Sequence, residues 1–517
     1  MEHLPKDIGT VEDILKRFTK AKERRELWRS TYEEAYDYAA PQRETFSLTM
    51  PGEKKNRHIF DSTAVDGLSQ FASRMQASHM PAWSQWVDLT AGSNVPEDEK
   101  KNVNAALEDS TKTFFNALNH SNFDTEIDQS LTDYGIGTGA IMIEEGSFKD
   151  DEIFIFTNIP LAELYPEKPG AGPIKTSFRY QSIPIGDIKN TWPNAELSNK
   201  MEADAKKEPL KETMIINGMI FNHEDRKYYH VIISEAEKKL LFVQSFNTKR
   251  LIIFRYMVSP GECFGRGPIL QAMSDIRTVN KVKQFILENG AIQIAGVYTG
   301  LDDGIFNPHT VRIAPGTVIP VNSNNPGNPS LSALPRSGDI GLGDLIINDL
   351  QTSIEKALFI NPIGDVDDPV KSATEIQIRM QEMLKRSGAS ISRLRTELID
   401  FLVAAGVDIL KGRGLMPDIT VDGKDVAIKH TSPMAKTEAL ENFQNSKVWF
   451  SSVTELAGIT GPEAIMGTVK IEELPSYWAE SLGVPLTLVR NKEEQAAVAK
   501  QAVDVVQTIG NEGNNGQ

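Results

Sequence analysis

Two long stretches of the chain, residues 268–290 and 342–360, carry apolar residues at every third or fourth position. This spacing places the apolar side chains on one face of an α-helix and leaves the charged residues on the other. Pro268 favours a helix start, because its missing N–H is not needed in the first turn. The apolar positions of the two stretches are Ile269, Met273, Ile276, Val279, Val282, Ile286, Leu342, Ile346, Leu350, Ile354 and Leu358.

The residues between these stretches have a different character. Short extended runs at 311–313 and 317–321 alternate with turns rich in Gly, Pro and Asn. We therefore predict two antiparallel helices that form a stalk, with a small extended module at its tip. Each helix has only one apolar stripe, so the other side should face water or a neighbouring subunit. The alternative is an ordinary helical hairpin within a globular core.

The remaining pattern predicts an α+β fold that is predominantly helical. Strand-like runs occur mainly between residues 140 and 260. Gly135-Ile-Gly137-Thr-Gly139 follows a helix and leads into a strand, so we interpret it as a tight turn and not as a dinucleotide-binding loop. The longest helix is expected at 372–411, with a capping box at its start and Gly412 as a left-handed cap. Further helices are predicted at about 10–40, 60–80, 99–119, 124–135 and 433–457, with a short one near 184–190.

The composition limits the classes of function. The net charge is −16, and the single cysteine, Cys263, excludes an internal disulfide and a cysteine-rich metal site. Proteins that hold nucleic acid by neutralising phosphates are usually basic, so tight DNA binding is disfavoured. A conduit through which DNA slides is a different case, because a basic wall would retain the phosphates. No apolar run approaches the ~18–20 residues of a membrane span, and we expect an intracellular protein without a signal peptide.

Recognisable catalytic chemistry is absent from the sequence. There is no phosphate-binding loop, no paired histidine motif and no nucleophile elbow, so we expect no enzymatic activity, no cofactor and no metal. Asp365, Asp367 and Asp368 have oxygen ligands that a divalent cation could use. The run departs from the calcium-loop pattern, and a loop of solvated acids is the favoured alternative.

Several motifs occur in a fixed order along the chain: Ile59–Thr63 through Trp86–Leu89, Tyr134–Gly139, Gly261–Pro268, Ser372–Glu375 with its long helix, and Thr431–Ala435. As a set, they resemble the portal, or head–tail connector, proteins of short-tailed bacteriophages. Phe264 stands where the family often has Tyr before Gly-Arg-Gly, and the part after about residue 440 matches only loosely.

The resemblance implies a portal fold with wing, stem, clip and crown. The loop after the second stem helix would project into a central channel. The implied segments are 1–265 (N-terminal wing, helices then β-rich), 266–294 (stem helix 1), 295–341 (clip), 342–360 (stem helix 2), 361–371 (channel loop), 372–430 (long wing helix and strands) and 431–517 (C-terminal crown helices).

The resemblance also implies partners and a location. Twelve copies would form a ring at one capsid vertex, assembled in the host cytoplasm and retained in the virion. Double-stranded DNA would pass through the ring during packaging and again during ejection. In the time between these two steps, the ring would retain the DNA. The implied protein partners are the terminase large subunit, the major capsid and scaffold proteins, and a tail adaptor protein. No membrane partner is expected.

The charges of the predicted stalk fit such a channel in part. Residues 268–290 carry three basic and two acidic residues (net +1), and residues 342–360 carry one basic and three acidic residues (net −2). Lysines repeated by ring symmetry would form weak cationic belts, or each would be solvated or paired between subunits. The channel candidates are Lys281, Lys283, Lys356, Lys371, Asp365 and Asp367.

Three hypotheses remain open at the level of the sequence. The first is a ring that conducts DNA passively. The second is a structural ring or adaptor of the virion that does not enclose DNA. The third is an acid-dependent hydrolase that uses Asp365, Asp367 and Asp368.

Overall fold

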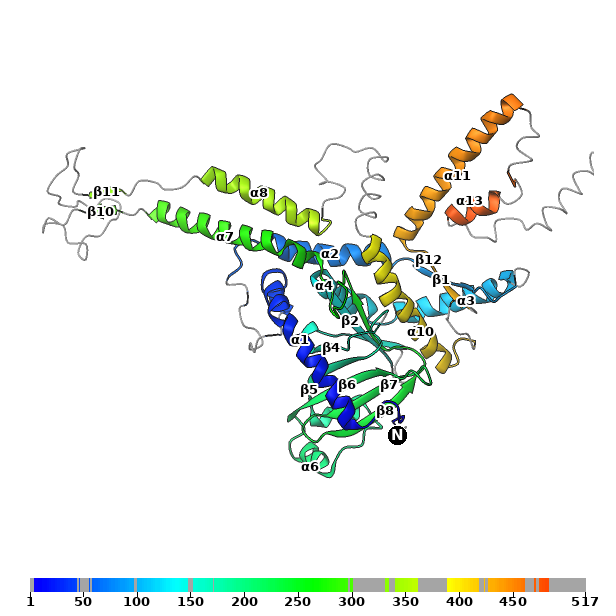
Figure 1. Ribbon diagram of the computed structural model, residues 1–517, viewed down its shortest axis with the longest axis horizontal. Coiled ribbons are helices and arrows are strands. Elements are labelled where there is room, and N and C mark those ends of the chain that lie inside the picture. The colour runs from blue at the N-terminus through cyan, green and yellow to red at the C-terminus, as the bar shows by residue number, and fades with distance from the viewer. Residues whose placement is uncertain are drawn as a thin grey trace, which may run out of the picture. The chain divides into compact units, whose positions relative to one another are not determined.

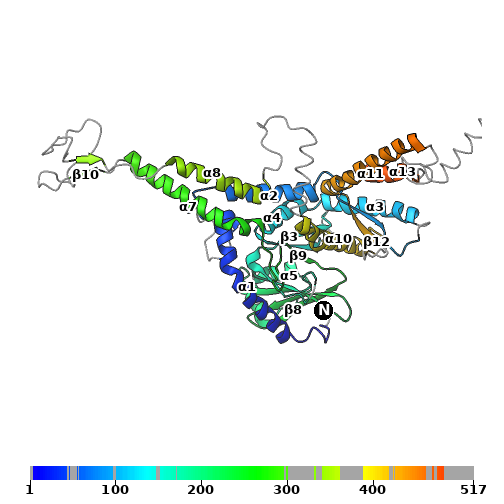
Figure 2. The same cartoon turned by 45° about the horizontal axis from the view of Figure 1, so that its top comes forward.

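The computed structural model divides the chain into two compact units, which are described separately below (Figures 1 and 2). Unit 1 comprises Met1–Arg74 and Ala117–Gly414, and unit 2 comprises Met75–Asn116 and Leu415–Gln517. The structure describes residues 4–43, 46, 55, 58–96, 100–146, 152–170, 172–295, 298–300, 331–333, 340–360, 388–417, 423, 426–460, 469–470 and 474–482.

Four N-terminal helices confirm the helical periodicity of the first third of the chain. The Thr10–Asp13 capping box begins the first of them. Asp61 caps the second, predicted at about 60–80, by accepting a hydrogen bond from the Thr63 N–H (3.0 Å). The helices are α1 (Val11–Ala39), α2 (Thr63–His79), α3 (Lys100–Asn119) and α4 (Phe123–Ile136), with a 3₁₀ turn, η1, at Pro41–Arg43.

A five-stranded antiparallel sheet with the order β4-β5-β6-β7-β8 forms the lower part of unit 1 in Figure 1. All five strands lie within the strand-like part of the chain predicted between residues 140 and 260, which they confirm. Its strands are β4 (Leu164–Pro166), β5 (Ser177–Pro184), β6 (Glu212–Phe221), β7 (Tyr228–Ser234) and β8 (Lys239–Phe246). The short helices beside it are η2 (Leu161–Glu163), η3 (Ile185–Asp187), α5 (Ile188–Thr191) and α6 (Asn199–Lys207).

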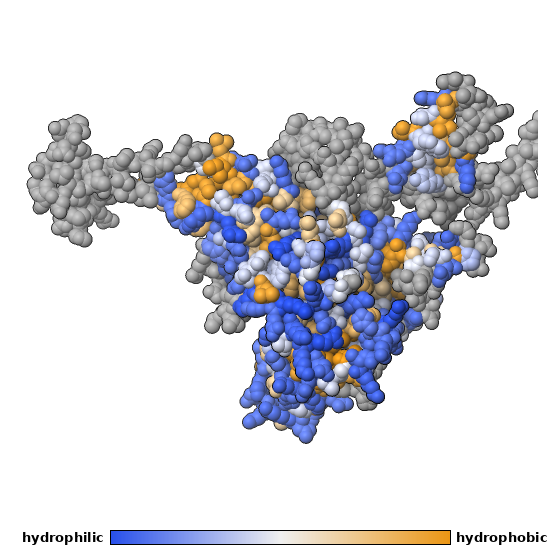
Figure 3. All heavy atoms as spheres, viewed as in Figure 1, coloured by the Kyte–Doolittle hydropathy of each residue, from blue (hydrophilic) through white to orange (hydrophobic). Residues whose placement is uncertain are grey.

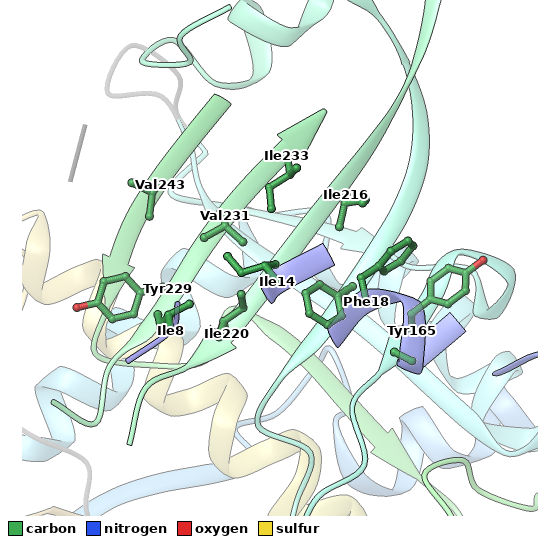
Figure 4. Close-up of a cluster of buried hydrophobic side chains, with 12 residues drawn as sticks. Ile8, Ile14, Phe18, Tyr165, Ile216, Ile220, Tyr229, Val231, Ile233 and Val243 are labelled. Atoms are coloured by element: carbon green, nitrogen blue, oxygen red, sulfur yellow. The ribbon is translucent and has the colours of Figure 1, made fainter. Parts of the chain in front are cut away.

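Both faces of this sheet are covered. On one face, Ile14 and Phe18 of α1 pack against a buried cluster that includes Ile216 and Val231 (Figure 4). On the other face, Trp192 and further residues near α5 and α6 pack against Ile215. Neighbouring residues of β6 thus point to opposite faces, as the period of two in a strand requires.

A second sheet, with the order β3-β2-β9, contacts α4 and the C-terminal part of the long helix. Its strands are β2 (Thr138–Glu145), β3 (Phe154–Asn158) and β9 (Leu251–Arg255). The described part of the long helix runs from residue 388 through a π-helical turn, η4 (Arg395–Ile399), into α10 (Asp400–Gly412). The predicted left-handed cap at Gly412 is wrong, because Gly414, at φ 72°, has the left-handed conformation and Arg413 follows the helix with φ −84°.

Unit 2 joins two segments that lie far apart in the sequence. β1 (Val87–Ala91) pairs antiparallel with β12 (Val426–His430), and Trp86 packs edge to face against Phe115. The helices are α11 (Pro433–Thr460) and α13 (Leu474–Leu482), which meet where Trp478 contacts Phe443 and Phe450. The helix predicted at 433–457 is confirmed, whereas the pairing of 87–91 with the C-terminal segment was not predicted.

The predicted helical hairpin is present in unit 1. α7 (Pro268–Ala295) and α8 (Ile340–Ala357) lie side by side in both ribbon views, and the short strands β10 (Tyr298–Gly300) and β11 (Leu331–Ala333) pair antiparallel beyond them. Some predicted features lie outside the described residues. They are the strands at 311–313 and 317–321, the loop 361–371 with Asp365, Asp367, Asp368 and Lys371, the capping box at 372–375 and the helices after residue 482.

Candidate functional site

The base of the hairpin is fixed by a crossing of two glycine-rich segments. A Cβ atom on Gly137 would collide with the Gly265 carbonyl oxygen, and one on Gly265 would collide with the Gly137 carbonyl oxygen. Only glycine allows two backbones to approach so closely. The Tyr32 hydroxyl donates to the Gly265 carbonyl (2.6 Å), and the Gly265 N–H donates to the Thr138 hydroxyl (2.8 Å). The prediction of a helix-to-strand turn at 135–139 is therefore confirmed.

The first half of α7 is part of the body of unit 1. Its buried residues end at Asn280, and among the described side chains of 281–295 none is buried. Asn280 itself holds the segment before α2. Its Oδ1 atom accepts from the N–H groups of Phe60 (2.7 Å) and Asp61 (3.2 Å), and its Nδ2 donates to the His58 carbonyl (2.9 Å).

Asp61 connects α2 to both helices of the hairpin. Its Oδ2 accepts hydrogen bonds from Lys283 Nζ in α7 (3.0 Å) and from Gln351 Nε2 in α8 (2.7 Å). The side chain is 2% exposed. Burial of the carboxyl tends to raise the pKa of Asp61, but hydrogen bonds from Thr63, Lys283 and Gln351 outweigh it, so the pKa lies below the ordinary value. A buried, ionised Asp61 thus fixes three helices at one point.

The C-terminal end of α8 is a Schellman motif with an unusual residue at its centre. The Ile360 N–H donates to the Glu355 carbonyl (2.9 Å) and the Phe359 N–H to the Lys356 carbonyl (3.4 Å). Phe359 has φ 56°, a left-handed conformation that usually belongs to glycine. The Arg74 side chain of α2 donates a hydrogen bond to the Phe359 carbonyl (2.8 Å). This end of the hairpin is therefore anchored to α2 as well.

The antiparallel register of the hairpin follows from its contacts. Ser353 Oγ donates to Asp275 Oδ2 (2.9 Å) near the base, and Gly343 packs against Ile286 farther out. The predicted stripe of α8 is confirmed at Ile354, which is fully buried. It is wrong at Ile346, because α8 turns Ile347 inward instead and leaves Ile346 exposed.

The outer half of the hairpin exposes large apolar side chains, which form an orange patch over α7 and α8 in Figure 3. Phe285 is 54% exposed, Leu345 69% and Ile294 90%. In a pair of helices, each helix buries only the side that faces the other. Apolar residues on the outer side of such a pair therefore need a further partner to be buried. The exposed residues of this patch are Phe285, Leu287, Ile294, Leu345 and Ile346.

Comparison of the sequence with known proteins shows the family of this chain. A sequence model of the family described as bacteriophage head to tail connecting protein matches residues 11–489. The chain belongs to this family. It is also 20% identical over 519 residues to the probable portal protein of Bordetella phage BPP-1, which covers 95% of this chain and 91% of that protein. The predicted membership of the portal and head–tail connector proteins is confirmed.

Membership of the connector family has consequences at a coarse level. A head–tail connector is a structural component of the virion and an oligomer, and the family gives no indication of catalysis. In the described part of the chain, no helix combines the length and the apolar character of a membrane span, and no group of three potential ligands is arranged to hold a metal ion.

The candidate channel residues differ in their surroundings. Lys281 is exposed on α7, donates to Gln284 Oε1 (3.0 Å) and lies 4.6 Å from the Phe285 ring centre. Lys356 is exposed on α8. The ammonium of Lys283 is instead paired with Asp61 of the same chain. A contact of these lysines with DNA stays a prediction.

The sequence indicated only part of this site. The pattern predicted a helix at about 60–80, and the apolar stripes predicted the hairpin. Nothing in the local pattern indicated that Asp61 would reach α7 and α8, that Asn280 would hold residues 58–61, or that Phe359 would adopt a left-handed conformation. The one available signal was the polar Asn280, which directly follows Val279 of the apolar stripe. A polar residue at that place could have indicated a buried hydrogen-bonding role.

Proposed function

We propose that this chain is the portal subunit of a bacteriophage, and that copies of it form a ring at one capsid vertex through which double-stranded DNA is packaged, retained and ejected. The observation that carries the proposal is the outer half of the α7–α8 hairpin. Its apolar side chains are exposed in the single chain, although the base of the hairpin is anchored at Gly265, Asp61 and Phe359. A firmly held rod with an uncovered apolar side is suited to packing against copies of itself.

The charges of the two helices favour a head-to-tail contact. The α7 stretch 268–290 carries net +1 and the α8 stretch 342–360 carries net −2. Lys283 and Arg277 of α7 are paired within the same chain, with Asp61 and Glu34, so the exposed Lys281 is the α7 cation that would face the acidic α8 of the next subunit. A contact between two different surfaces generates a ring when the rotation closes. The resemblance to the portal family implies that the ring has twelve copies.

DNA would pass such a ring without being gripped. The two stem stretches together are slightly acidic, so a wall built from them would hold phosphates weakly. Lys281 and Lys356, which are exposed, are the described candidates for weak cationic belts along the channel. The energy for packaging would come from the terminase large subunit. The major capsid and scaffold proteins would surround the ring, and a tail adaptor protein would bind it after packaging.

Assembly can be tested on the purified full-length chain. Negative-stain images should show annuli with a central hole, and replacing Phe285 and Leu345 together with Ser should shift the protein to monomers. The matched control is Leu210→Ser, because Leu210 is 83% exposed but lies outside the hairpin. A wild-type chain that stays monomeric at micromolar concentration contradicts the proposal, and so does a double variant that assembles normally.

Passage of DNA needs a separate test, because an adaptor ring that does not enclose DNA would pass the first one. A photo-crosslinking amino acid at position 281 should react with DNA in particles arrested during packaging. The same group at position 200, on α6, should not. Absence of DNA adducts at position 281 in rings that package DNA would favour the adaptor.

A further inference from the structure

A cleft of about 790 Å³ lies in unit 1, between two loops and the part of the long helix around its π-helical turn, and the function proposed above does not involve it. The helix contributes Ser392, Arg393 and Thr396, one loop contributes Lys168, and the other contributes residues 258–262. The helix changes to a π-helical turn at Arg395, directly beyond Arg393. Such turns are frequent at functional sites, because they alter which side chains a helix presents.

The charges of the cleft are unbalanced. Both carboxylates that line it are already paired: Glu397 with Arg255, and Glu262 with Arg266 (2.8 Å). Arg255, which also lines the cleft, is neutralised by Glu397 in the first of these pairs. This leaves Arg393 and Lys168, and within the described chain neither has an ion pair. Two cationic side chains therefore line the cleft without a compensating carboxylate.

Arg393 also has an unused hydrogen-bond donor. Its Nη1 atom is buried and has no acceptor among the described residues. A buried N–H of a charged group without an acceptor is destabilising, and such groups are rare in folded proteins. A ligand oxygen in the cleft would relieve this cost after a small rotation of the guanidinium. Lys168 is exposed, and its ammonium lies over the loop at Gly261, about 3.8 Å from the position of a Cβ there.

We propose that this cleft binds a phosphoryl group, held by Arg393 and Lys168, with the Ser392 hydroxyl as a further donor. A guanidinium, an ammonium and a hydroxyl match the negative charge and the several acceptor oxygens of a phosphate group better than those of a single carboxylate. The open cleft accommodates a group that is still attached to a larger molecule. The phosphoryl group belongs either to a DNA backbone or to a free phosphate.

The site can be tested by calorimetric titration of the full-length protein with inorganic phosphate at constant ionic strength. Wild type should bind, and Arg393→Gln and Lys168→Gln should each weaken binding by about tenfold or more, since each removes a charge-assisted hydrogen bond. Lys200→Gln, which removes an exposed lysine on α6, should bind like wild type. Arg393→Lys keeps the charge and should be intermediate. Lys168→Gln should melt like wild type, which separates loss of the site from loss of the fold.

Two further arms identify the source and the chemistry of the ligand. If the source is DNA, a duplex competes with inorganic phosphate in wild type, and a duplex with an uncharged methylphosphonate backbone does not. If the source is free phosphate, neither duplex competes. The proposal is overturned if wild type does not bind phosphate, if both glutamine variants bind it like wild type, or if glutamate binds as tightly. None of these results depends on ring assembly, so they are distinct from a failure of the proposed function.

Discussion

The body of unit 1 and the outer half of its hairpin distribute polar and apolar groups in opposite ways. The body buries charged side chains, including the Arg255–Glu397 pair and Lys249, whereas the hairpin exposes Phe285 and Leu345. These buried groups have partners within the same chain: Glu397 accepts from Arg255, and Lys249 donates to the Ile174 carbonyl. Phe285 and Leu345 of the hairpin stay largely exposed in the single chain. In the proposed ring, a neighbouring copy would cover them.

The largest effect on the body is expected from breaking its buried ion pair. Glu397→Gln leaves the Arg255 guanidinium buried without its counter-charge, and should lower the free energy of unfolding by about 3–5 kcal/mol. Glu262→Gln, which breaks the more exposed Arg266 pair, should cost less than about 1 kcal/mol. Urea unfolding of both variants measures the difference. Equal costs would mean that the Arg255–Glu397 pair is not buried as described.

A smaller effect is expected at the junction between body and hairpin. Asp61→Asn removes the charge that Lys283 and Gln351 contact, and should cost about 1–3 kcal/mol. Because the pKa of Asp61 is lowered in the folded chain, its contribution is present above the pKa of the unfolded carboxyl and is lost as the pH falls through the folded value. The variant should therefore lose less stability than wild type between neutral and strongly acidic pH. Parallel pH profiles would rule out an ionised, buried Asp61.

Lys249 should make the stability of the body depend on pH in the alkaline range. Burial lowers the pKa of this lysine to about 7. Between that value and the ordinary pKa, the unfolded chain binds one more proton than the folded chain, so stability rises with pH by at most about 1.4 kcal/mol per unit. Lys249→Met should remove this slope between neutral pH and the onset of tyrosine ionisation. Urea midpoints that rise with pH equally in both proteins would contradict the burial of an ionisable amine.

The smallest effect is expected at the end of α8. Phe359→Gly relieves the left-handed conformation of a non-glycine residue, but it also gives the unfolded chain more freedom and removes a side chain. The net change should be within about 1 kcal/mol of zero and on the stabilising side if strain dominates. Gly290→Ala is the comparison within the outer hairpin, where the added methyl group meets nothing within 4 Å and should stabilise by up to about 1 kcal/mol.

Periodicity predicted the elements well and their long-range arrangement poorly. The hairpin, α1 to α4, β5 and β7 follow from local spacing, because a period of 3.6 or 2 is set by the backbone. The pairing of 87–91 with 426–430 and the choice of Ile347 over Ile346 depend on tertiary packing, which no local pattern contains. Lys283 stays a predicted channel candidate, and in the single chain its ammonium pairs with Asp61, which lies more than two hundred residues earlier in the sequence.

The central claim is that a neighbouring copy covers the outer half of the hairpin. Hydroxyl-radical footprinting of the assembled particle and of the single chain tests it directly. Phe285 and Leu345 should be oxidised several-fold more slowly in the particle, whereas Leu210 should react equally in both. Equal oxidation of Phe285 and Leu345 in both states would contradict the claim.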